Sequence, residues 1–321
     1  MPAASANPIF IVSSGRSGST ILTWCLGQHP NILPQEESNW LGPFAVHTAV
    51  DYRLGAMRGE RGQLSANFIS REDLLQAFGD TIDKLIVSRR GQFENVDLRR
   101  TAGWAPPPFP VSRSTNEPKA RWVDGTPEYS LYICALRKLF PRAVFIHLVR
   151  DVRDVVRSLL NFYGDGANRL VETEQAAYEY WLRRATACGD AERAYGSGVV
   201  YRLRYVDLAT EPEQTMRLLF RFLDEPYAAA CLEPLQLRIN SSKVPADFDE
   251  READTDPAVV ARARRLSDEL LGTPQPEAAS AEAAAKLEAQ FDERVDYLAS
   301  LEGRPATSAS TQATGARRSV E

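Results

Sequence analysis

Residues 8–30 read PIFIVSSGRSGSTILTWCLGQHP, and this stretch decides the fold. Residues 8–13 form a short, apolar, β-branched run that ends at a Gly/Ser cluster, a pattern typical of a buried parallel strand. From Thr20 the apolar residues recur on one face of a helix, until His29 and Pro30 close the segment. The chain therefore opens with a strand, a glycine-containing loop and a helix.

The rest of the chain alternates between strand-like and helix-like patterns. Further apolar strands are expected at 143–149 and 199–204. Helices are expected over about 72–87, 129–139, 151–161, 172–195, 211–223 and 276–301. Because strands alternate with helices, we expect an α/β fold: a single P-loop-like domain with a central parallel sheet flanked by helices, a helical insertion and a helical C-terminal extension.

The expected domain boundaries follow changes in composition. The α/β domain is assigned to residues 1–250, the helical extension to 251–302, and a tail too poor in apolar residues to fold to 303–321. Within the first domain, residues 45–120 carry a weaker pattern that is broken by APPPFP at 105–110. We expect these residues to form an insertion over the sheet that shapes an acceptor pocket.

Composition excludes several kinds of partner. A formal net charge of −5 gives no general attraction to nucleic acid or to an anionic membrane. The four cysteines are widely spread and do not combine with the three histidines at metal-ligand spacing, so neither a metal site nor disulfides are indicated. No run reaches the roughly 18 apolar residues of a membrane span, and residues 1–8 lack the basic start of a signal peptide. We expect a cytoplasmic protein.

The loop between the first strand and helix, Ser13–Thr20, is suited to binding an anion. Its glycines let the backbone bend, and the N–H groups of residues 16–20 are expected to point into the turn at the positive end of the helix dipole. The guanidinium of Arg16 adds a positive charge that can make two hydrogen bonds to an anion, and the hydroxyls of Ser19 and Thr20 add further donors. A nucleoside-triphosphate loop would carry GxxxxGK[ST], whose lysine is missing here. An ordinary capped turn is the alternative interpretation.

A second anion element follows the strand expected at 143–149. Arg150 stands at the carboxyl end of this strand, where open α/β sheets bind ligands. Ser158 follows eight residues later, about two helical turns, and so lies near the same face. The pair is suited to one phosphate. The alternative is a helix start with ion pairs between Asp151, Asp154 and neighbouring arginines.

Two anion elements after two strands, without the lysine, resemble the sulfotransferases that use 3′-phosphoadenosine 5′-phosphosulfate (PAPS). Gly15–Thr20 resembles their 5′-phosphosulfate loop, and Arg150 with Ser158 resembles their 3′-phosphate element, RDxRxxxxS. The sequence is most similar to the tyrosylprotein sulfotransferase branch and related bacterial enzymes. That similarity covers roughly residues 8–245 and rests on RSGST at 16–20, HP at 29–30, EE at 36–37, FP at 140–141, YVDL at 205–208 and SKV at 242–244.

The resemblance implies transfer of a sulfuryl group from PAPS to an acceptor hydroxyl or amine, by in-line displacement without a metal. It assigns Glu37, the second glutamate of the EE pair, as the general base and Arg16 as the group that stabilises charge on the departing nucleotide. The residues assigned to binding the nucleotide are Arg16, Ser17, Gly18, Ser19, Thr20, Arg150, Ser158, Tyr205 (at the adenine), and Ser242 with Lys243 (at the 3′-phosphate end).

The chain departs from the family pattern at one catalytic position. A family lysine near the position of Gly125 is absent, so its contribution comes from Arg16, from another residue, or from nothing. The membrane anchor of the tyrosylprotein enzymes is also not found, so a small-molecule, glycosidic or peptidic acceptor is expected rather than protein tyrosine in particular.

Other assignments remain open at this stage. His47 is an alternative base, whereas His29 and His147 are expected to be packed structural residues. The alternative functions are a non-catalytic nucleotide-binding module and another phosphotransferase.

Overall fold

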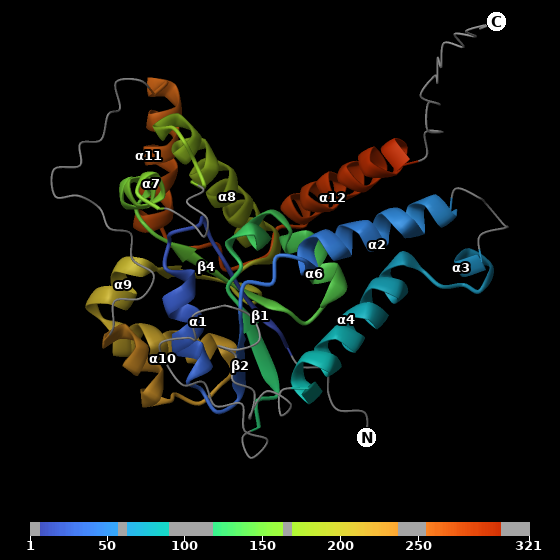
Figure 1. Ribbon diagram of the computed structural model, residues 1–321, viewed down its shortest axis with the longest axis horizontal. Coiled ribbons are helices and arrows are strands. Elements are labelled where there is room, and N and C mark those ends of the chain that lie inside the picture. Colours follow the sequence, from blue (N-terminus) through green and yellow to red (C-terminus); the bar gives the residue numbers. More distant parts are fainter. Residues whose placement is uncertain (1–6, 57–62, 90–117, 163–168, 237–254, 303–321) are drawn as a thin grey trace, which may run out of the picture.

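The computed structural model describes residues 7–56, 63–89, 118–162, 169–236 and 255–302 (Figure 1). Its centre is a five-stranded sheet in the order β2-β3-β1-β4-β5, in which every pair of neighbours is parallel. The strands are β1 (Ile9–Val12), β2 (Ile32–Gln35), β3 (Arg121–Asp124), β4 (Val144–Val149) and β5 (Val200–Arg204). The expected α/β fold with a central parallel sheet is confirmed.

The α-helices are α1 (Ser19–Gly27), α2 (Leu41–Ala56), α3 (Gln63–Ala66), α4 (Arg71–Arg89), α6 (Ile133–Leu139), α7 (Val152–Leu160), α8 (Glu174–Tyr195), α9 (Tyr205–Thr210), α10 (Pro212–Leu223), α11 (Pro257–Gly272) and α12 (Ala281–Glu302). Two 3₁₀ helices, η3 (Pro127–Leu131) and η4 (Ala229–Gln236), join them.

Helices cover both faces of the sheet (Figure 1). All four residues of β1 are buried, because helices cover both faces of the sheet. Since successive residues of a strand point to opposite faces, these four residues are divided between two separate cores. Phe10 and Val12 pack in a core built with α2, α6, α8 and α12. Ile9 and Ile11 pack in a core built with α1, α9 and α10. A strand that is apolar at every position is the pattern expected of a sheet covered on both sides.

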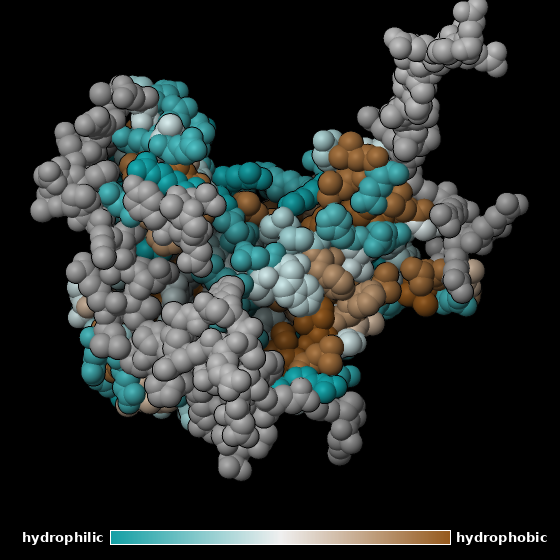
Figure 2. All heavy atoms as spheres, viewed as in Figure 1, coloured by the Kyte–Doolittle hydropathy of each residue, from teal (hydrophilic) through white to brown (hydrophobic). Residues whose placement is uncertain are grey.

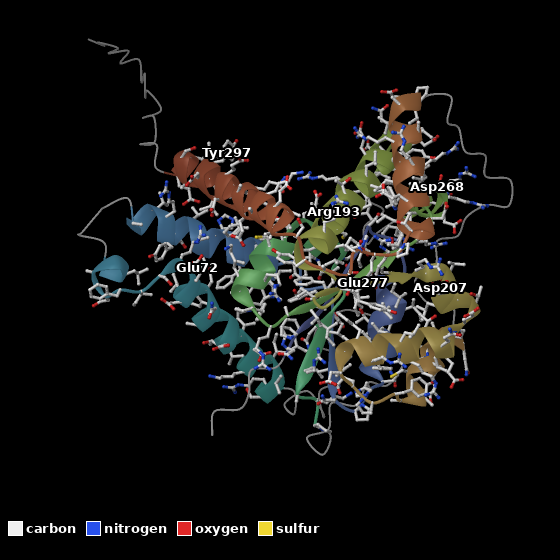
Figure 3. The ribbon with its side chains drawn as sticks, turned by 180° about the vertical axis from the view of Figure 1, so that it is seen from behind. Glu72, Arg193, Asp207, Asp268, Glu277 and Tyr297 are labelled. Carbon is white, nitrogen blue, oxygen red and sulfur yellow. The ribbon has the colours of Figure 1, made fainter. Side chains whose placement is uncertain are left out.

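The two C-terminal helices are built into these layers. Apolar residues of α11 pack with α7 and α8, and those of α12 pack in the core that contains Phe10. The connection between the two helices is bonded to the end of α8: Ser197 N–H donates to the carbonyl of Glu277 at 3.1 Å, and Ser280 N–H donates to the carbonyl of Arg193 at 2.9 Å. Figure 3 shows Glu277 and Arg193 in this region.

Most of the expected elements are present with ends shifted by a few residues. The helix expected over 72–87 is α4, the one over 172–195 is α8, and the strands at 143–149 and 199–204 are β4 and β5. The helix expected over 129–139 is divided between η3 and α6, and the one over 276–301 begins only at Ala281. The sequence analysis did not predict β2, β3, α2, α3, α9 or α11. The expected tail at 303–321 lies outside the described residues.

Candidate active site

The candidate site lies along the carboxyl edge of the sheet. Because all five strands are parallel, the residues that follow them meet at this edge, the usual ligand-binding edge of an open α/β sheet. The anion loop follows β1, Glu37 follows β2, Thr126 follows β3, Arg150 follows β4 and Tyr205 follows β5. Residues that are up to almost 200 positions apart are thus brought to one edge.

The anion loop bends sharply where it joins α1. Gly18 caps the helix with φ +104°, and Arg16 also has a left-handed backbone with φ +70°. A Cβ at Gly18 would lie 2.7 Å from the ring of Tyr205, so only glycine fits there. The first turn of α1 contains no acidic residue, which leaves the positive end of the helix free to attract an anion.

The two anion elements adjoin one another. Arg16 Nε donates to Ser158 Oγ at 3.3 Å, and Arg150 Nη1 donates to the carbonyl of Arg16 at 3.2 Å. The guanidinium of Arg150 also lies 4.8 Å from the centre of the Tyr205 ring. That of Arg16 lies 4.0 Å from the centre of the Phe162 ring. Ser158, expected to work with Arg150, therefore contacts Arg16.

The electrostatics of Arg16 favour a bound anion. Burial and the neighbouring positive charge of Arg150 lower the pKa of the Arg16 guanidinium, while the charge of Glu37 partly opposes this. Two guanidinium groups side by side repel each other, and a phosphate or sulfate bound against both would offset that repulsion. This donor set fits an anionic nucleotide such as the one that the resemblance implies.

Glu37 lies two residues beyond β2 and has an unusual proton affinity. Burial together with the charges of Asp124 and Glu128 raises the pKa of Glu37 to about 7, against an opposing effect of Arg16. The residue as a whole is exposed, although its carboxyl lies close enough to neighbouring groups for burial to shift its pKa. A carboxylate whose pKa lies near neutrality is well matched to accepting a proton at physiological pH. Adjacent Glu36 is also exposed.

Four residues around this site were missed by the sequence analysis, three of them in or beside helices. These three are Phe162 at the end of α7, and Tyr180 and Arg184 of α8. Each lies in or beside a helix whose pattern indicates packing, and nothing in the pattern singles it out. Glu128, next to Pro127, was also missed, because β3 before it was not predicted.

The histidines lie in structural positions, apart from His47, which is exposed on α2. The ring of His29 accepts from Asn31 N–H at 3.1 Å through Nδ1, so its Nε2 donates to the carbonyl of Pro226 at 2.9 Å. His147 is buried in β4, with Nδ1 2.6 Å from a carboxylate oxygen of Glu192. His29 and His147 are therefore packed residues, as the sequence analysis expected.

Gly125, the position near which the family carries a lysine, is closely packed. A Cβ there would lie 2.2 Å from Thr23 Oγ1 of α1. A side chain at this position therefore requires α1 to move or Thr23 to change. The structure gives no room for the missing lysine at Gly125 itself.

Gly125→Ala is expected to lower the free energy of unfolding by about 1–3 kcal/mol, the usual cost of overpacking a buried position. Thr23 Oγ1 is buried without a hydrogen-bond partner among the described residues, so Thr23→Ala should cost little by itself. The double variant should then recover most of the lost stability in urea denaturation. A single variant as stable as the wild type would contradict this packing.

Some of the assigned residues lie outside the part of the chain that the structure describes. Ser242 and Lys243, together with Trp104 and Phe109 of the expected insertion, lie outside the described residues. Within the ranges given above, no group of three or more His, Cys, Asp or Glu residues is placed to hold a metal ion. Nor does any helix in those ranges have the length and hydrophobicity to cross a membrane.

Comparison with known proteins identifies relatives of this chain. The model of the sulfotransferase family matches residues 8–229. A protein-tyrosine sulfotransferase of Drosophila melanogaster is 23% identical over 246 residues, which make up 77% of this chain and 44% of that protein. The chain thus spans less than half the length of this curated relative.

Solved sulfotransferase structures give weaker likenesses. The sulfotransferase domain of the Synechococcus PCC 7002 olefin synthase is 21% identical, with 91% of this chain and 97% of that domain covered and a TM-score of 0.44. Sulfotransferase STF1 of Mycobacterium tuberculosis H37Rv is 15% identical, with 84% and 77% covered and a TM-score of 0.44. The assignment rests on the family model, whose match covers more than half of the chain and includes both anion elements and Glu37: the chain belongs to the sulfotransferase family.

Proposed function

We propose that this protein transfers a sulfuryl group from PAPS to an acceptor hydroxyl or amine, with Glu37 as the general base. The observation that carries the proposal is the convergence of Arg16, Arg150 and Glu37 at the carboxyl edge of one sheet. The charge of Arg16 acts on Glu37, and the charge of Arg150 acts on Arg16. A site of this kind can hold the donor and deprotonate the acceptor in one place.

The donor supplies an activated sulfuryl group, whose bond to the 5′-phosphate oxygen breaks with its electron pair going to that oxygen. Glu37 takes the proton of the acceptor hydroxyl as the acceptor oxygen forms its bond to sulfur. Arg16 and the amides of Ser17–Thr20 stabilise the negative charge that accumulates on the departing 3′,5′-adenosine bisphosphate. No metal is assigned a role.

The remaining binding assignments divide the nucleotide between two ends. Ser17, Gly18, Ser19 and Thr20 are proposed to hold the 5′ end, and Arg150 and Ser158 the 3′-phosphate. The ring of Tyr205 lies against Gly18 and under Arg150, which supports its assignment beside the adenine. Ser242 and Lys243 are retained as proposed contacts of the 3′-phosphate end.

The acceptor is proposed to approach over residues 45–120. These residues are proposed to be an insertion in the α/β domain, which ends near residue 250. Trp40, three residues beyond Glu37, is 47% exposed, and its ring centre lies 5.7 Å from that of Phe44. Phe44 in turn packs against Phe78 at 5.5 Å. Figure 2 shows hydrophobic side chains gathered along α4. This aromatic row suits an acceptor that has an apolar or ring-shaped part, whether small, glycosidic or peptidic.

We propose the cytoplasm as the place of action. All four cysteines are free thiols, which suits a reducing compartment.

The proposal is tested by binding and then by turnover. Adenosine 3′,5′-bisphosphate should raise the melting temperature of the protein, whereas ATP, which lacks the 3′-phosphate, should do so far less. An acceptor screen with sulfur-labelled donor then measures transfer. Equal stabilisation by ATP favours the alternative phosphotransferase. Bisphosphate binding without transfer to any acceptor favours the alternative of a non-catalytic nucleotide-binding module.

A further inference from the structure

A half-buried network of hydrogen bonds joins α8 to the residues that follow β3. The hydroxyl of Tyr180 donates to Glu128 Oε1 at 2.9 Å, and Arg184 Nη2 donates to Glu128 Oε2. The Arg184 guanidinium also stacks on the Tyr180 ring, 3.4 Å from its centre. Both oxygens of Glu128 thus face donors, an arrangement suited to a carboxylate that carries its full charge.

Tyr180 extends this network to the anion loop. Its hydroxyl lies against Gly15, where an added Cβ would be 2.8 Å from the hydroxyl oxygen. Burial raises the pKa of the Tyr180 hydroxyl, which keeps it a proton donor to Glu128. One phenol therefore links the loop after β1 to the carboxylate after β3.

The segment that carries Glu37 is hydrogen-bonded to the segment that carries Glu128. Ser38 N–H donates to Thr126 Oγ1 at 2.9 Å, and the hydroxyls of Ser38 and Tyr129 are hydrogen-bonded to each other. These contacts attach the residue after Glu37 to residues on both sides of Glu128.

Three charged groups act on Glu37 from the elements around it. Arg16 of the anion loop favours its ionised form, whereas Asp124 at the end of β3 and Glu128 of η3 oppose it. Asp124 is fully buried and accepts from the amide and hydroxyl of Thr126, and burial raises its own pKa. Glu128, by contrast, has a guanidinium partner that supports its negative charge.

We infer that Glu128 is a positioning residue for the base: Tyr180 and Arg184 clamp its carboxylate beside Glu37, so that a fixed negative charge faces the group that accepts the proton. This inference rests on the proposed function of Glu37. The network makes the anion loop and the base parts of one unit, although they follow different strands. It also gives α8 a role at the site that its packing pattern does not reveal.

Glu128→Gln removes the charge and keeps the shape. The Gln side chain still offers an oxygen to Arg184, so the fold should be retained. With one negative neighbour fewer, Glu37 should lose its proton at a pH lower by at least about half a unit. Glu179→Gln is the matched control, because Glu179 lies beside Tyr180 in sequence but is exposed on α8. It should leave the titration of Glu37 unchanged.

The test is a titration of the protein without nucleotide, followed by NMR of ¹³C-labelled glutamate carboxyls, with the Glu37 signal assigned by its loss in Glu37→Gln. A lower midpoint in Glu128→Gln, but not in Glu179→Gln, supports the inference. An unmoved midpoint in a folded Glu128→Gln protein overturns it. Since no donor or acceptor is present, this result does not depend on whether bisphosphate binds, which tests the proposed function separately.

Tyr180→Phe provides a second readout. It keeps the ring under Arg184 and removes only the hydroxyl that lies against Gly15 and donates to Glu128. The affinity for adenosine 3′,5′-bisphosphate, measured by calorimetry, should fall several-fold, because the loop loses an anchor that holds it in its binding geometry. An unchanged affinity would contradict the linkage of the loop to Glu128.

Discussion

Glu37→Gln is expected to lower the rate of sulfuryl transfer by about 10²–10⁴-fold, the usual contribution of a positioned general base. The affinity for adenosine 3′,5′-bisphosphate should be essentially unchanged, because the base faces the acceptor and the bound product carries no acceptor. The rate of the wild-type protein should rise with pH through about 7, where Glu37 loses its proton. Initial rates with labelled donor over a pH series measure both effects.

Glu36→Gln is the matched control, since Glu36 is the neighbouring exposed carboxylate. Its rate and pH profile should stay close to those of the wild type. A Glu37→Gln protein that transfers sulfate at the wild-type rate would show that another group accepts the proton.

The titration of Glu37 should also make the folding stability of the protein depend on pH. Its pKa is about 7 in the folded protein, above the ordinary value of 4.5, so the folded state holds its proton more tightly than the unfolded chain does. Folding stability should therefore fall as pH rises from about 4.5 to 7, and this loss should be absent in Glu37→Gln. Urea denaturation at several pH values compares the two proteins without any substrate. Parallel pH profiles of stability would contradict the raised pKa.

Arg150→Ala is expected to weaken binding of adenosine 3′,5′-bisphosphate by about 10–100-fold, because a charge-assisted hydrogen bond contributes about 1.5–3 kcal/mol. Arg150 also donates to the carbonyl of Arg16 and lies over the Tyr205 ring, so its loss loosens the loop as well. Isothermal titration calorimetry measures the dissociation constant directly.

Arg153→Ala is the control for this change. Arg153 lies in the first turn of α7, three residues beyond Arg150, and is exposed. The control should bind bisphosphate as the wild type does, apart from a small effect of net charge. An equal loss of bisphosphate affinity in both variants would mean that binding depends on the overall charge of the protein and not on a site at Arg150.

The parts of the fold that could be predicted are those in which local pattern and burial agree. β1 and β4 are apolar at nearly every position, which indicates strands covered on both faces. β2 contains Pro34, and β3 begins with Arg121 and ends with Asp124, so neither has that pattern. β3 is buried all the same, because Arg121 donates to the carbonyls of Asn7 and Leu223.

The candidate site was predictable to the extent that its residues stand in contiguous motifs. The anion loop and Arg150 follow apolar strands, so their position at the carboxyl edge of the sheet could be inferred. Tyr180 and Arg184 reach Glu128 only because α8 packs across η3, a long-range contact that no local pattern contains. The contact of Arg16 with Ser158 likewise depends on how α7 packs beside the loop.

The central claim is that one nucleotide with phosphates at both ends binds across both anion elements, with Glu37 beside its 5′ end. A crystal structure with adenosine 3′,5′-bisphosphate tests this most directly. The account predicts one phosphate against the amides of residues 16–20, the other against Arg150 and Ser158, and the carboxyl of Glu37 facing the space beyond the 5′-phosphate. A bisphosphate bound away from either element, or with its 5′ end remote from Glu37, would contradict it.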